Sequence, residues 1–587
     1  MRKMNKAALA LLLATCGIVR AQATTPDVLE VLPANALVAG KIANLSATSK
    51  KLAQLASQLG VDAFEPSFKD PLGALKTKGH LENGLNENGQ IGFAFMDPKL
   101  AGGNDDNSFL FVVPVSDYDA FLTNFNVTDG ATKQVTPKDG GRPMFVANWN
   151  GYAAISPTET LVAKPSATMK PAAAATKESA KQDFLIVTNF AELGPMLMPQ
   201  LDKGVAEFEK EFERAGGKDL DPKYKPLVKV GVGQLFNAAK TFLNSTDAAT
   251  VGLNISDAGL NFTVLSSFKA DSYLGKISGD FKGTEKPLTV GLPAMKYLVY
   301  GGSALDPSVT SRVFEDLFGP VLAEVDKLEG IPQAKKLVGD AKASVKKSTG
   351  ATFGMPAPQK IGEEGILQQV VVYRGGGPEF KTLFTDGAAL GKQIIADLKL
   401  PEGQPKPGLE IAANDKAIEG VNFDSIKLDL PPNPNDPMAQ MQAQMQKIMY
   451  GPNGLSYHYG TLNDDLILSN GASDETLAAF IKAVKANEDS ISKTDPFKAV
   501  ASELPKTRVL EYYVQLDEIV NTGVQTAAQF GFPVQVQLPP DLPPLGINFG
   551  GDGTSLRLDA HLPTSTVQAL IAAGFQAFAG MRGGGNL

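Results

Sequence analysis

A short segment occurs twice in this chain of 587 residues, and its repetition constrains the fold more than any other feature. "VGLNISDAG" at 251–259 and "LGINFGGDG" at 545–553 share a Gly, an Asn and a Gly in one register, with apolar residues between them. In both copies, alternating apolar runs flank a turn that contains Asp and Gly, which is typical of a β-hairpin. A segment with helical spacing follows each copy. We therefore expect a hairpin–helix unit that is used more than once.

Weaker copies of this unit occur at 91–125 and 454–484. A second element, a strand that runs directly into a helix, recurs four times, beginning "ALVAGKIANL", "DFLIVTNF", "KYLVYGGSAL" and "RVLEYYVQL". Together these patterns predict an α+β fold of tandem repeated modules, in which helices cover antiparallel sheet. They also predict an internal duplication into halves at about 27–290 and 291–587.

Segments that lack large apolar residues, or that are rich in proline, mark the expected boundaries between modules. The predicted order is a signal peptide at 1–23, module 1 at 24–165, a linker at 166–182, module 2 at 183–290, module 3 at 291–400, a linker at 401–408, a continuation of module 3 with a Met-rich helix at 409–505, and module 4 at 506–587.

Single residues at the ends of these elements carry local predictions. Ser46, Asp306 and Asp517 are each placed to accept a hydrogen bond from the first free amides of a helix. Gly259 and Gly553 occupy the hairpin turns, where we expect a positive φ that glycine adopts without strain. "GAALGKQ" at 387–393 is one residue too short between its glycines for a phosphate loop, and we interpret it as helix.

The first 23 residues predict export. Basic residues precede an apolar run, and Ala21-Gln22-Ala23 provides the small residues of a signal-peptidase site, so we expect cleavage after Ala23. Cys16 allows a lipoprotein as a minor alternative, but Thr15 before it is larger than a lipobox usually has. Cleavage would leave a mature chain without cysteine, which favours a bacterial protein of the periplasm or the extracellular space over a disulfide-bonded secreted protein.

The composition excludes several classes of partner. Acidic residues outnumber basic ones, 63 to 55, and no basic stripe is apparent, so we expect no nucleic-acid partner. No segment after the signal has the 18 or more apolar residues of a membrane span. The expected partner is an unknown envelope macromolecule or an apolar ligand.

The order of the elements resembles that of large exported bacterial proteins of unknown function, of the domain-of-unknown-function type. The resemblance begins at an N-terminal strand, "LPANALVAGKIANL", and continues through "PVSDYDAFL" and "AIEGVNF", so that it spans most of the mature chain. It implies the repeated strand–helix and hairpin–helix modules. It implies no activity or cofactor.

Chemistry-bearing motifs are scarce. His80, His458 and His561 are the three histidines, and none has a second His or Cys at metal-ligand spacing. No Gly-X-Ser-X-Gly segment is present to position a nucleophile. We therefore expect no catalytic, cofactor-binding or metal-binding residues and no cofactor, and we interpret the protein as not an enzyme. A hydrolase with a dispersed active site stays open, because carboxylates are abundant.

The most distinctive segment is "DPMAQMQAQMQKIMYG" at 436–451. Met438, Met441, Met445 and Met449 recur at spacings of three, four and four, which places the thioethers on one face of a helix. We expect this face to pack inside the protein, since Met fills irregular apolar gaps. The alternatives are a groove for a partner or an apolar ligand, and a soft-metal site for Cu(I).

Three functions follow from these observations. The first is a non-enzymatic binding or structural scaffold of the envelope, which large repeated modules without catalytic motifs favour. The second is a periplasmic carrier of a lipid or other apolar ligand, in which sheet and helices enclose a cavity lined by the Met face. The third is the dispersed-site hydrolase.

Overall fold

The computed structural model describes residues 27–103, 105–170, 173–216, 225–327, 332–397, 405–431, 438–531, 536 and 538–583. Contacts divide the chain into two compact units, each made of several segments. Unit 1 contains residues up to 50, 70–171 and 183–189, and unit 2 contains 51–69, 172–182 and 190–587. The fold is α+β, as expected, with twenty strands among the described residues and antiparallel pairing throughout.

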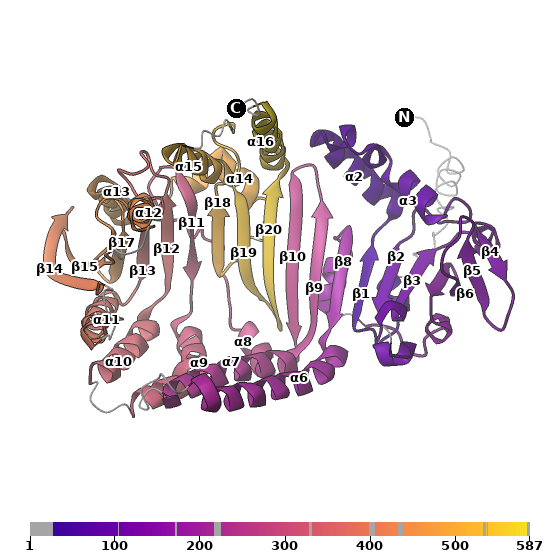
Figure 1. The fold of residues 1–587 in the computed structure, drawn as a ribbon, viewed down its shortest axis with the longest axis horizontal. Coiled ribbons are helices and arrows are strands. Elements are labelled where there is room, and N and C mark those ends of the chain that lie inside the picture. Colours follow the sequence, from indigo (N-terminus) through magenta and orange to yellow (C-terminus); the bar gives the residue numbers. More distant parts are fainter. Residues whose placement is uncertain are drawn as a thin grey trace, which may run out of the picture. The chain divides into compact units, whose positions relative to one another are not determined.

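Unit 1 contains an eight-stranded sheet in the order β4-β5-β6-β7-β3-β2-β1-β8 (Figure 1). The strands are β1 (Val38–Ile42), β2 (Ile91–Phe95), β3 (Phe109–Pro114), β4 (Phe125–Thr128), β5 (Lys133–Pro137), β6 (Met144–Asn148), β7 (Tyr152–Ser156) and β8 (Phe184–Asn189). Helices α3 (Pro71–Gly79) and α4 (Tyr118–Leu122) accompany them, and α2 (Leu45–Gln58) crosses the boundary after residue 50.

Unit 2 contains twelve strands in the order β9-β10-β20-β19-β18-β11-β12-β13-β17-β16-β15-β14. They are β9 (Thr246–Ile255), β10 (Gly259–Phe268), β11 (Tyr297–Ala304), β12 (Gly350–Pro356), β13 (Gln369–Arg374), β14 (Gly408–Ile418), β15 (Val421–Asp429), β16 (Leu455–Leu462), β17 (Asp465–Asn470), β18 (Leu510–Val514), β19 (Leu545–Asp552) and β20 (Ser555–Pro563).

The strand orders follow one rule. Adding ten to each strand number of β4-β5-β6-β7-β3-β2-β1-β8 gives β14-β15-β16-β17-β13-β12-β11-β18, and the hairpin β9-β10 corresponds in the same way to β19-β20. The two hairpins are those of the repeated sequence, and β10 pairs with β20. Val264 pairs with Leu558, which is the residue at the same position of the second copy.

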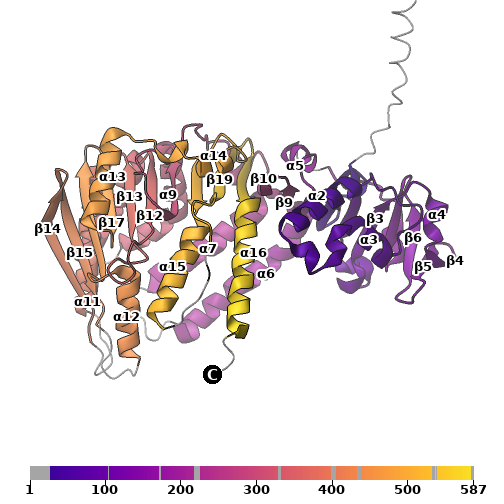
Figure 2. The ribbon, with the colours of Figure 1, turned by 90° about the horizontal axis from the view of Figure 1, so that it is seen from above.

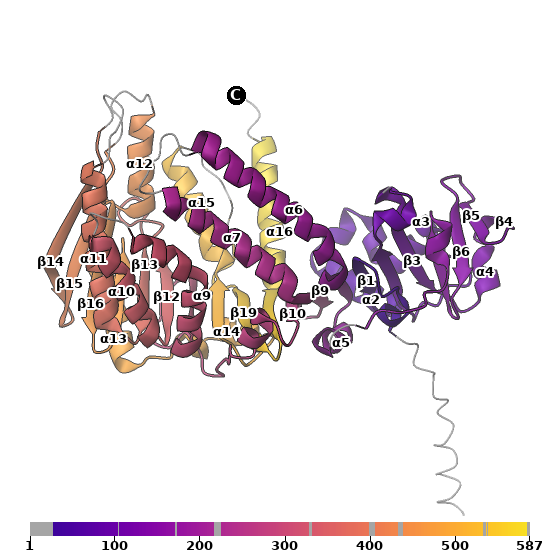
Figure 3. The same cartoon turned by 90° about the horizontal axis from the view of Figure 1, so that it is seen from below.

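Helices of unit 2 lie on both sides of its sheet. They are α5 (Ala173–Ser179), α6 (Phe190–Glu211), α7 (Lys225–Ser245), α8 (Tyr273–Ser278), α9 (Pro307–Val325), α10 (Pro332–Lys347), α11 (Gly377–Asp397), α12 (Ala439–Tyr450), α13 (Asp474–Ala486), α14 (Asp495–Ala501), α15 (Leu516–Gln529) and α16 (Thr564–Gly583). Figures 2 and 3 show α13 and α14 on one side of the sheet, and α6, α7, α12, α15 and α16 on the other.

An extensive apolar core lies between the sheet and helices α13 and α14. Val370 and Val372 on β13, Tyr513 on β18 and Phe480 on α13 are fully buried there. On the opposite side, α11 covers the far strands, where Phe384 packs near buried Leu466, Leu468 and Tyr459. No helix among the described residues is long and apolar enough to cross a membrane.

The repeated stretches are hairpins, as predicted, but the two turn glycines differ. Gly553 has a φ of 63°, in the left-handed region. Gly259 has a φ of 159°, close to extended backbone, and a Cβ there would lie 2.2 Å from the carbonyl oxygen of Leu562. Gly553 is therefore required by the conformation of the turn, whereas Gly259 is required by the close approach of β20.

The helix ends also correct the sequence reading. Asp306 caps α9 by accepting a hydrogen bond from the amide of Ser308, as predicted. The cap of α2 is formed by Asn44, which accepts from Ala47, because the helix begins before Ser46. Asp517 is the second residue of α15 instead of its cap, and its carboxylate accepts from the amide of Leu542. The segment 387–393 lies within α11, as predicted.

The structure describes one of the predicted linkers almost completely, part of the other, and none of the predicted signal peptide. Residues 173–179 of the predicted linker 166–182 form helix α5, so this segment is partly regular structure. In the second linker, 401–404 lies outside the described residues and Gly408 begins β14. The predicted signal peptide, Cys16 and the cleavage position after Ala23 also lie outside them. The division into four consecutive modules stays a prediction.

Candidate functional site

The three histidines lie in different places and form no common site. His80 is 3.1 Å from Asp139 in unit 1, and His458 on β16 is 3.5 Å from Asp415. His561 on β20 is buried, and its Nδ1 is 2.7 Å from Oδ1 of Asn261. Burial lowers the pKa of His458 and of His561, which favours neutral imidazoles. Among the described residues, no group of three or more His, Cys, Asp or Glu side chains could hold a metal ion.

The Met-rich segment is helical, but the expectation that its Met face packs inside the protein is wrong. Met438, Met441 and Met445 are 49%, 41% and 47% exposed. The fourth methionine, Met449, is half-buried next to buried Ile448 and Gly451. The carbonyls of Ile448 and Met449 accept hydrogen bonds from the amides of Ile366 and Leu367, which attach this end of α12 to the rest of unit 2. Exposed thioethers leave the two alternatives, a binding face and a Cu(I) site, as predictions.

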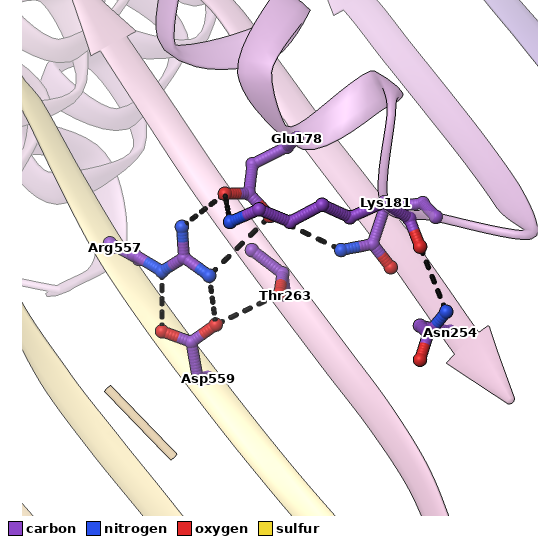
Figure 4. A network of polar contacts seen from close by, with 7 residues as sticks. Glu178, Lys181, Asn254, Thr263, Arg557 and Asp559 are labelled. Atoms are coloured by element: carbon purple, nitrogen blue, oxygen red, sulfur yellow. Dashed lines mark hydrogen bonds and ion pairs between the residues drawn. The ribbon is translucent and has the colours of Figure 1, made fainter. Parts of the chain in front are cut away.

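A cluster of charged side chains lies between α5 and strands β10 and β20 (Figure 4). Arg557 on β20 donates to both oxygens of Asp559, at 2.6 and 2.7 Å, and to Glu178 on α5 at 2.5 Å. Glu178 also accepts from Lys181 at 3.2 Å, and Asp559 accepts from the hydroxyl of Thr263 at 2.8 Å. Glu178 and Asp559 are buried, so the cluster fixes α5 on strands β10 and β20.

The electrostatics of this cluster follow from its contacts. Burial acts to raise the pKa of Glu178, but the hydrogen bonds and charge of Arg557 outweigh it and lower that pKa. Burial acts to lower the pKa of Arg557, but Asp559 and Glu178 outweigh it and raise that pKa. Glu178 and Arg557 are thus held in their charged forms, and neither is available as a general acid or base near neutral pH.

A polar cleft of about 730 Å³ adjoins the cluster within unit 2. Its walls are α5 with the turn after it, strands β9, β10, β19 and β20, and the loop 503–507. Besides the cluster, the side chains that line it include Asn254, Asn261, Asn548, Glu503, Lys506, Thr507 and Asp552. The cleft is therefore built from amides, hydroxyls and charges of both signs.

The same strands present an apolar surface on their opposite side, which we term the open sheet face. Its side chains are Val251 and Leu253 on β9, Leu260, Phe262 and Val264 on β10, Leu556, Leu558 and Ala560 on β20, Leu545, Ile547 and Phe549 on β19, Leu510, Tyr512 and Val514 on β18, Val299 on β11, and Phe353 and Met355 on β12. None of them is buried, whereas the residues that alternate with them along these strands are mostly buried.

The centre of the open sheet face is the most exposed part. Val251, Val264 and Leu558 are direct cross-strand neighbours on β9, β10 and β20, and they are 47%, 37% and 39% exposed. Figure 1 shows α6, α7 and α9 at one end of the strands of unit 2, and α15 and α16 at the other. Those helices add exposed apolar residues, including Leu235 and Phe575. An apolar surface at the centre of a sheet is normally covered by helices or by a second sheet.

Sequence reasoning missed both surfaces. Arg557, Asp559 and His561 alternate with leucines in "LRLDAHL", which signals one polar and one apolar face on β20. The signal does not say which face the protein covers. Here the polar face is the covered one and the apolar face is open, which reverses the usual arrangement of an antiparallel sheet. Glu178 could not be paired with Arg557 from sequence, since 379 residues separate them.

Comparisons with known proteins give no family. No protein-family model and no curated protein matches the chain. A solved structure titled "Structure of crystal form III of TP0453" is similar at 9% sequence identity, over 49% of this chain and 98% of that one. Its TM-score of 0.19 is too low to support a shared fold.

Proposed function

We propose that this protein is a non-enzymatic carrier that binds a lipid or another molecule with a flexible apolar chain on the open sheet face. The observation that supports the proposal is the row Val251, Val264 and Leu558, exposed at the centre of a sheet. Covering apolar surface contributes about 25 cal/mol per Å², so a ligand laid along this face gains affinity from area alone.

The surroundings of the face favour a flexible occupant over a second sheet. Two sheets pack face to face at about 10 Å. Helices α6, α7, α15 and α16 stand on the same side as the open sheet face (Figures 2 and 3) and would hold another sheet away from it. An acyl chain is narrow and flexible, and it can follow the exposed row of side chains without the 10 Å spacing that a second sheet requires. The carrier predicted from the sequence had an enclosed cavity lined by the Met side chains. In the present proposal the ligand instead lies on an open face formed by strands, and the Met side chains of α12 are not part of that face.

The test is binding of a fluorescent fatty acid, cis-parinaric acid, to the purified full chain after delipidation. Val251→Asp should weaken binding about tenfold or more, because the acyl chain would cover a carboxylate without a partner. The matched control is Val127→Asp, since Val127 is also a strand valine, is 40% exposed and lies in unit 1. Absence of binding by the wild type, or equal losses in the two variants, would overturn the proposal and favour a macromolecular partner for this surface.

We also propose that the protein is exported and that its halves arose by duplication. The residues at 1–23 support export, and mass spectrometry of the mature protein should find Thr24 at its N-terminus. The shared strand order and the pairing of Val264 with Leu558 support duplication. Detection of a diacylglyceryl group on Cys16 would instead establish the lipoprotein alternative.

A further inference from the structure

The polar cleft has a chemistry that the proposed carrier function does not use. It lies on the covered side of β9, β10, β19 and β20, whereas the open sheet face lies on the other side of these strands. Its volume of about 730 Å³ falls within the range of about 300–1,000 Å³ that small-molecule sites occupy. The cleft therefore has room for a ligand of its own.

The charges around the cleft cancel. Four basic side chains, Lys177, Lys181, Lys506 and Arg557, face four acidic ones, Glu178, Glu503, Asp552 and Asp559. Arg557 is the most deeply placed cation, and its donors are already directed at the carboxylates of Asp559 and Glu178. An anion would have to displace one of these carboxylates, and a cation would compete with Arg557. Ionic ligands are thus disfavoured.

Uncharged groups at the cleft retain hydrogen-bonding capacity. Asn261 uses its Oδ1 with His561, and its Nδ2 group has no partner among the described residues. Asn548 is 2% exposed and donates from Nδ2 to the carbonyl of Pro505, which leaves its Oδ1 without a partner in the described part of the chain. Thr507 adds a hydroxyl from the loop. The oxygen of Asn548 and the amide nitrogen of Asn261 are therefore free to pair with a ligand or with water.

We propose that this cleft binds a neutral polyhydroxylated ligand, such as a segment of a saccharide. Each hydroxyl of such a ligand both donates and accepts, so one hydroxyl can donate to Oδ1 of Asn548 on β19 while another accepts from Nδ2 of Asn261 on β10. The neutral charge of the ligand matches the cancelled charges of the walls. The site rests on different residues from the open sheet face, and either proposal can fail without the other.

The experiment is isothermal titration calorimetry of the full chain with chitotriose, maltotriose, inorganic phosphate and calcium chloride as separate probes. Gly550 lies in the cleft wall, and a Cβ there would have its nearest contact at 3.6 Å from the carbonyl of Thr507, so Gly550→Leu should fill the cleft without backbone strain. Gly408→Leu is the matched control, a strand glycine on β14 with its nearest contact at 3.4 Å. Thr507→Val, at an exposed position, provides a second cleft variant that removes one hydroxyl.

We expect one of the two saccharides to bind, Gly550→Leu to weaken that binding at least tenfold, Thr507→Val to weaken it severalfold, and Gly408→Leu to leave it unchanged. Val251→Asp should not affect it, which separates this site from the carrier surface. The proposal is overturned if neither saccharide binds, if phosphate or calcium binds in their place, or if both cleft variants bind as the wild type does. Thermal melts of each variant confirm that it is folded.

Discussion

Replacing Glu178 with Gln tests whether the buried cluster holds α5 on the sheet. Glu178 accepts hydrogen bonds from Arg557, Lys181 and Gln182, and its side chain is 2% exposed. A hydrogen bond to a charged group contributes about 1.5–3 kcal/mol, and breaking a buried ion pair costs about 3–5 kcal/mol when it strands the partner. Arg557 keeps both contacts with Asp559, so it is not stranded. We therefore expect Glu178→Gln to lower the free energy of unfolding by about 2–3 kcal/mol.

Urea unfolding followed by two signals measures this loss. Far-ultraviolet circular dichroism reports on the whole chain, whereas Trp149, the single tryptophan, is buried in unit 1 and its fluorescence reports there. The loss should appear in the circular dichroism transition. Because the pKa of Glu178 is lowered in the folded protein, its contribution is present above pH 4.5 and is lost as the pH falls through the folded-state pKa, so wild type and variant should converge in acid.

The control is Glu207→Gln, because Glu207 pairs with Lys203 at 3.6 Å on the exposed side of α6 and should change stability by less than about 0.5 kcal/mol. If Glu178→Gln also changed the free energy of unfolding by less than about 0.5 kcal/mol, the inference that the cluster fixes α5 on the sheet would be refuted.

Three further changes follow from the structure. Gly553→Val should lower the free energy of unfolding by about 1–2 kcal/mol, measured in urea, because a β-branched residue is strained at a φ of 63°. Replacing Met441 and Met445 with Leu should shift stability by less than about 0.5 kcal/mol in thermal melts, since both are exposed, and loss of tight Cu(I) binding in competition titrations of this variant would establish the soft-metal alternative. Burial raises the pKa of Glu511 despite the charge of Arg508, so its contribution to stability is present below pH 4.5 and is lost as the pH rises through the folded-state pKa. Urea midpoints at pH 4.5 and 7.5 should therefore fall with pH more for the wild type than for Glu511→Gln.

The hairpins and the α+β class could be predicted because they depend on local patterns. Alternation and turn residues at 251–265 and 545–559 determine strands whatever surrounds them. The strand–helix units were found for the same reason, as in β11 followed by α9. The boundaries could be predicted only to within a few residues, since the cap of α2 is Asn44, two residues before the predicted Ser46.

The candidate sites depend on which side of a strand is covered, and this is a tertiary property. The leucines at 556 and 558 would normally be placed in the core, yet it is the side that carries Arg557 and Asp559 that α5 packs against. The prediction that the Met side chains pack inside the protein was wrong for a related reason. Spacing placed Met438, Met441 and Met445 on one side of a helix, but spacing does not show that a neighbour is present to bury that side.

The position of β20 has a consequence for how the chain folds. Strand β10 is complete at residue 268, but its second partner is not available until residues 555–563 have been made. Until then β10 is an edge strand with unpaired amides and carbonyls and with apolar side chains at alternate positions 260, 262 and 264, which is a template for pairing with another chain. Closure of the sheet requires a contact across nearly 300 residues, as between Thr263 and Asp559, which are 296 apart. Long-range pairing of this kind slows folding. The chain thus has a long interval during its synthesis in which a chaperone that shields β10 would prevent aggregation.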